Sequence, residues 1–63
     1  MRDPNRIPEI IALLQRGWQK VDDWRLGQLI ENLKRYIGLD DLFYIEDDKM
    51  IEKIIDYFDL DEV

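Results

Sequence analysis

The chain has 63 residues, which is enough for one small domain, and we expect residues 1–63 to form it. It contains no Cys, His, Ser or Thr, so disulfides, zinc sites and most nucleophilic or acid–base catalysis are excluded. Hydrophobic residues make up 46% and charged residues 38%, with a formal net charge of −6, a composition that fits neither a disordered tail nor a membrane protein.

The first periodic run of apolar residues predicts a helix over residues 8–20. Pro8 suits the first helical position because it has no N–H to leave unpaired. Gly17 lies inside this helix, which indicates either the close approach of a neighbouring element or a locally weak helix. The apolar positions recur at spacings of three and four and are Ile10, Ile11, Leu13, Leu14, Trp18 and Val21.

A second run predicts a helix over residues 24–37. An aspartate of the preceding turn, Asp22 or Asp23, is expected to cap its free amides, and Gly38 is expected to end it in the left-handed conformation. The apolar stripe of this helix consists of Leu26, Leu29, Ile30, Leu33 and Ile37.

Residues 39–45 are expected to form an extended apolar loop that packs on the core, with Phe43 among the buried aromatics. A third helix is predicted over residues 47–58, because the helix dipole stabilises acidic side chains at the start of a helix. Residues 59–63 are expected to be a fraying acidic tail. The sequence therefore predicts an all-α fold, a compact three-helix bundle.

Charge is unevenly divided along the chain. Residues 1–35 carry seven basic and five acidic side chains, whereas residues 36–63 carry two basic and ten acidic ones. Such asymmetry indicates a non-catalytic interaction protein whose acidic half faces a basic protein partner, although the acidic residues could serve solubility alone. The candidate partner-binding residues are Trp24, Tyr44, Asp47, Asp48, Glu52 and Asp56.

No cofactor, metal or catalytic residue is expected. The densest carboxylate cluster lacks the glycine and the alternating ligands of a calcium-binding loop, so the favoured interpretation is stabilisation of a helix start. That cluster comprises Asp40, Asp41, Glu46, Asp47 and Asp48.

Other functions stay open at this stage. A helix-turn-helix-like nucleic-acid binder would use Arg25, Lys34 and Arg35, but the negative net charge of the chain opposes phosphate binding. An inhibitor that mimics nucleic acid fits the acidic half of the chain better. Trp24 and Tyr44 could anchor a partner or simply cap the edge of the bundle. A homodimer is a further possibility, because a small core gains from packing against a copy of itself.

Several segments resemble one known family. They are Arg6–Lys20, Asp23, Leu26–Leu33 and Asp41–Ile51, and they are similar to the YihD-like family of small bacterial proteins of unknown function. The resemblance implies a mostly helical, cytoplasmic, single-domain bacterial or phage-borne protein and transfers no functional residue. A cytoplasmic location without a membrane partner is also expected because no stretch approaches the ~20 apolar residues of a spanning helix.

Overall fold

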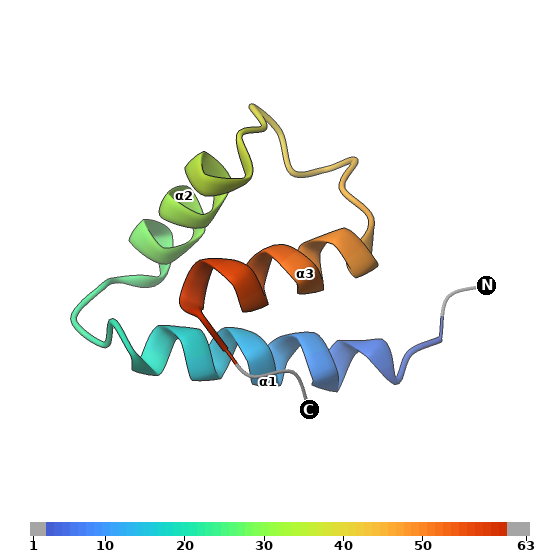
Figure 1. Ribbon diagram of the computed structural model, residues 1–63, viewed down its shortest axis with the longest axis horizontal. Helices are drawn as coiled ribbons and strands as arrows, with labels where there is room; N and C mark the ends of the chain where they lie inside the picture. Colours follow the sequence, from blue (N-terminus) through green and yellow to red (C-terminus); the bar gives the residue numbers. More distant parts are fainter. Residues whose placement is uncertain (1–2, 61–63) are drawn as a thin grey trace.

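The computed structural model describes residues 3–60, and within them it contains three α-helices: α1 (Arg6–Gln19), α2 (Leu26–Ile37) and α3 (Asp47–Phe58). The chain turns back twice, so that α3 packs against both α1 and α2, which diverge from each other (Figure 1). The predicted all-α three-helix bundle is confirmed. None of the helices in residues 3–60 has the length and apolar content that crossing a bilayer requires.

Helix α1 begins at Arg6, two residues before the predicted start. The backbone N–H of Arg6 donates to the Asp3 carbonyl over 3.2 Å, and the Asp3 side chain accepts from the Asn5 N–H over 2.9 Å. Pro8 is therefore the third helical residue and not the first. It is tolerated there because the amides of the first turn have no partner within the helix.

Helix α2 begins at Leu26, so the predicted start at residue 24 and the aspartate cap are both wrong. The Trp24 N–H donates to the Val21 carbonyl over 2.9 Å, which holds the intervening residues in a turn. The cap residue is Arg25, whose N–H donates to the Gln28 side chain over 2.8 Å. At the other end, the predicted left-handed cap is confirmed, because Gly38 has φ of 84°.

Helix α3 has the predicted bounds, but the segment after it differs from the expected tail. Asp59 adopts the left-handed conformation, and the Leu60 N–H donates to the Ile55 carbonyl over 2.9 Å, which is a Schellman-type helix end. Leu60 is consequently buried in the core. The prediction of a fraying tail is wrong for this residue, and residues 61–63 lie outside the described part of the chain.

The core is small and lies where α3 meets the other two helices. Gly17 of α1 is there because a Cβ at this position would lie 2.4 Å from the Phe58 ring, so close approach explains this glycine. On the same side, the Lys20 ammonium donates to the carbonyls of Phe58 and Asp59 over 2.9 and 3.2 Å, which satisfies the end of α3. The buried apolar residues are Leu13, Leu29, Leu33, Ile54, Phe58 and Leu60.

The loop between α2 and α3 does not pack as expected. Phe43, predicted to be buried, is 81% exposed. Its N–H donates to the Asp41 side chain over 2.9 Å, and the Ile45 N–H donates to the Leu42 carbonyl over 3.3 Å. These bonds fold the segment into a turn, in which Leu42 and Ile45 are half-buried while the ring between them faces solvent.

Candidate functional site

Three exposed carboxylates form a line along one face of α3. Asp48, Glu52 and Asp56 are all exposed and follow one another at intervals of four residues, which places them on one side of the helix. Their positions along the helix axis differ by about 6 Å from one to the next. We call these residues the acidic stripe.

Asp47, also predicted as a site residue, is separated from the stripe. Its carboxylate forms an ion pair with Arg6, and both side chains are partly buried. This pair joins the first turn of α3 to the first turn of α1. Asp47 therefore has a structural partner within the protein and is not part of the exposed stripe.

The stripe residues have only light contacts with their neighbours. The Asp48 carboxylate accepts from the Lys49 N–H over 2.9 Å, and Glu52 lies 3.5 Å from the Lys49 ammonium in an exposed ion pair. Asp56 accepts a hydrogen bond from the Tyr36 hydroxyl of α2. This hydrogen bond raises the pKa of Tyr36, because it favours the neutral phenol beside a carboxylate.

Two exposed aromatic rings precede α3. Phe43 and Tyr44 are each 81% exposed, and their ring centroids lie 4.9 Å apart in an edge-to-face arrangement. Both residues line a cavity of about 520 Å³ that extends to Asp47 and Met50 of α3. We call these two residues the aromatic pair. Tyr44 was a predicted site residue, whereas Phe43 was missed because its apolar character predicted burial.

Trp24 does not join Tyr44 in a single patch. Trp24 precedes the start of α2 and Tyr44 follows its end, and the 12 residues of this helix extend over about 18 Å. Trp24 is half-buried against the core, and its carbonyl accepts from the Trp18 indole N–H over 2.8 Å. Trp24 thus lies at the edge of the bundle, as one interpretation expected, while the exposed Tyr44 does not cap the core.

The basic residues considered for nucleic-acid binding do not form one cluster. Arg25 precedes the first residue of α2, whereas Lys34 and Arg35 lie in the last turn of this helix, about 13 Å further along its axis. The arrangement supplies no continuous positive face of the kind that phosphate binding uses.

The carboxylates that lie closest in sequence also have separate contacts. Asp41 accepts from the Phe43 N–H, Asp47 pairs with Arg6, and Asp48 accepts from the Lys49 N–H. Within residues 3–60, no three acidic side chains converge as metal ligands would.

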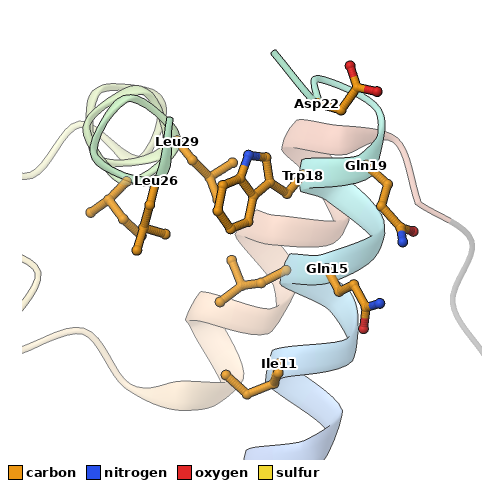
Figure 2. A pocket seen from close by; sticks show the side chains of 9 residues that line it. Ile11, Gln15, Trp18, Gln19, Asp22, Leu26 and Leu29 are labelled. Carbon is orange, nitrogen blue, oxygen red and sulfur yellow. The ribbon is translucent and has the colours of Figure 1, made fainter. Parts of the chain in front are cut away.

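An apolar groove separates α1 from α2. Its volume is about 540 Å³. Figure 2 shows the side chains that line it. Ile11 and Leu26, on its two walls, are 56% and 57% exposed although the sequence placed both on core stripes. The lining residues are Ile11, Leu14, Gln15, Trp18, Gln19, Asp22, Leu26, Leu29 and Ile30.

Comparison with known proteins adds no further assignment. No family model matches the chain, and no curated protein or solved structure matches it significantly. The resemblance to the YihD-like family therefore stays a prediction.

Proposed function

We propose that this protein is a non-catalytic interaction module that binds a basic partner protein through the acidic stripe of α3. The observation that carries the proposal is the regular, exposed placement of Asp48, Glu52 and Asp56 on one helix face. The half of the chain that contains the stripe has two basic and ten acidic residues, so its field attracts cationic surfaces from a distance.

The spacing of the stripe suits a partner segment with regularly spaced basic residues. Its carboxylates recur at about 6 Å along the helix axis. In an extended segment, basic residues at every second position are about 6.6 Å apart along the chain. In a helix, basic residues at every fourth position are about 6 Å apart along the axis. A basic segment of either kind can place its cations opposite successive carboxylates.

The aromatic pair supports the proposal from the chain segment directly before α3. Phe43 and Tyr44 are exposed, and large aromatic side chains often dominate the binding energy of interfaces. A partner that reaches from the stripe to the aromatic pair would combine ionic attraction with apolar burial. Steering by charge then sets the rate of association, while burial of the rings sets the lifetime of the complex.

The test uses a synthetic peptide with lysine at every second position, titrated against the protein at low and high salt. The double variant Asp48→Asn, Glu52→Gln removes two charges from the stripe. The matched control, Glu9→Gln with Glu31→Gln, removes the same charge from exposed positions of α1 and α2. We expect binding to weaken in high salt and in the stripe variant, but little in the control.

Equal weakening in both double variants would show that only net charge matters, and salt-insensitive binding would refute the electrostatic basis of the proposal. The same variants, used as baits in an extract of the native cells, identify the partner. The protein that the proposal requires is captured by the wild type and the control and is lost from the stripe variant.

A further inference from the structure

The groove between α1 and α2 exposes apolar side chains of both helices. Ile11 of α1 is 56% exposed, and Leu26 of α2 is 57% exposed. Figure 2 shows Trp18 reaching from α1 towards Leu26 and Leu29 of α2. Both helices therefore contribute apolar side chains to the groove, which Gln15, Gln19 and Asp22 also border.

The surface area of the molecule indicates how much is left to cover. The chain exposes 5091 Å². A folded monomer of 7.7 kDa is expected to expose roughly 4,300 Å². The excess of roughly 750 Å² is spread over the whole chain, and Ile11 and Leu26 in the groove contribute to it together with Phe43 and Tyr44 outside it.

The charges around the groove permit a second copy to bind there. On the α1 side, Gln15 and Gln19 are uncharged and point away from α2 (Figure 2). Among the described residues that line the groove, Asp22 is the one with a charge. The acidic stripe lies on α3 and does not line the groove, so two chains of net charge −6 can meet here without bringing their carboxylate lines together.

Two residues of opposite charge lie at the two ends of the α2 side of the groove: Asp22 borders the groove, and Lys34 lies beyond the last residue that lines it. Asp22 lies before the start of α2, whereas Lys34 follows Ile30 by four residues and so lies one turn further along the same side of this helix. A two-fold axis through the middle of the groove exchanges these ends. It would bring Asp22 of each copy next to Lys34 of the other, which makes the surface complementary to itself.

We propose that two copies of this chain form an antiparallel, two-fold symmetric dimer by pairing their α1–α2 grooves. The apolar walls of each groove cover those of the other, and the Asp22–Lys34 contacts set the direction. The proposed interface is separate from the acidic stripe, so a failure of one proposal leaves the other standing.

Sedimentation equilibrium from micromolar to millimolar concentration tests the dimer. Ile11→Glu and Leu26→Glu each place a charge in the groove, and both positions are exposed enough in a single chain for the helical fold to persist, which circular dichroism checks. We expect each variant to raise the dimer dissociation constant at least tenfold. Phe43→Glu, at an exposed position outside the groove, should leave the constant unchanged.

Exchange of the end charges tests the proposed direction. Asp22→Lys alone and Lys34→Asp alone should each weaken pairing about threefold to tenfold, because like charges then meet at both ends. An equimolar mixture of the two single variants should pair at least as well as the wild type, since each chain supplies the charge that the other needs.

Three results would overturn the proposal. A wild-type protein that stays monomeric up to millimolar concentration has no such dimer. If Phe43→Glu weakens the dimer as much as Ile11→Glu does, the dimer interface is not the groove. A mixture of the charge variants that pairs no better than either variant alone excludes the antiparallel arrangement.

Discussion

The contact between Gly17 of α1 and the Phe58 ring of α3 can be tested with a single methyl group. In Gly17→Ala, the new Cβ would lie 2.4, 2.7 and 2.8 Å from three carbons of that ring. Ordinary carbon–carbon contacts are about 3.5–4.0 Å, so the ring has to retreat by about 1 Å or the two helices have to separate. Phe58 is buried, so its ring cannot move into solvent without losing its packing.

The expected loss of stability follows from two opposing terms. Overpacking of a core costs about 1–3 kcal/mol, and contact with three ring atoms favours the upper part of that range. The higher helix propensity of alanine offsets about 1 kcal/mol of this loss. We therefore expect Gly17→Ala to lower the free energy of unfolding by about 1–2 kcal/mol, and the Tm by about 5–15 °C.

The matched control is the same substitution in α2. A Cβ at Gly27 would meet nothing within 4 Å, so Gly27→Ala should raise stability by about 0.5–1 kcal/mol. Urea unfolding followed by circular dichroism measures both variants, at one protein concentration because self-association would shift the midpoint. A Gly17→Ala protein as stable as the wild type would refute the claim that the α1–α3 separation requires this glycine.

The remaining predictions concern the ends of the helices and the Tyr36 hydroxyl. Leu60→Ala should lower the free energy of unfolding by about 2–4 kcal/mol in urea titrations, because Leu60 is buried; a loss below about 0.5 kcal/mol would contradict that burial. Lys20→Met should cost about 1 kcal/mol, because it removes the hydrogen bonds to the carbonyls at the end of α3, and an unchanged midpoint would show that water replaces them. The hydrogen bond to Asp56 raises the pKa of Tyr36 above its ordinary value of 10.0, so its stabilising effect is complete below pH 10 and is lost as pH rises through the pKa of the folded state. Wild-type protein should thus lose more stability than Tyr36→Phe between neutral and strongly alkaline pH, and equal losses would exclude the effect.

Local sequence chemistry determined the number of helices within residues 3–60, and both bounds of α3. Acidic residues at the start of α3 and the glycine after α2 act on the nearest backbone groups, so their effect can be read without knowing the rest of the fold. The start of α2 was predicted wrongly. The Trp24 N–H donates to the Val21 carbonyl and the Trp24 carbonyl accepts from the Trp18 indole, so Trp24 belongs to a turn before the helix and no aspartate caps it.

The candidate surfaces were predicted less completely. Spacing of four residues was enough to place Asp48, Glu52 and Asp56 on one helix face. It did not reveal that Asp47 pairs with Arg6, because the two residues are 41 positions apart in the sequence. Exposure of Phe43 was missed for a related reason: an apolar side chain next to a core gives no local sign that a turn directs it outward.

The periodicity of apolar residues identified which side of each helix avoids water, and that much is a property of the sequence alone. Only the tertiary structure decided which of these sides are covered, since coverage depends on where the other helices lie. Leu29 and Leu33 are buried, whereas Ile11 and Leu26 stay exposed at the groove. Leu60 is buried in the core although the acidic residues around it predicted an exposed tail. A pattern along one helix records the preference for burial, whereas burial itself requires a partner surface from a distant part of the chain.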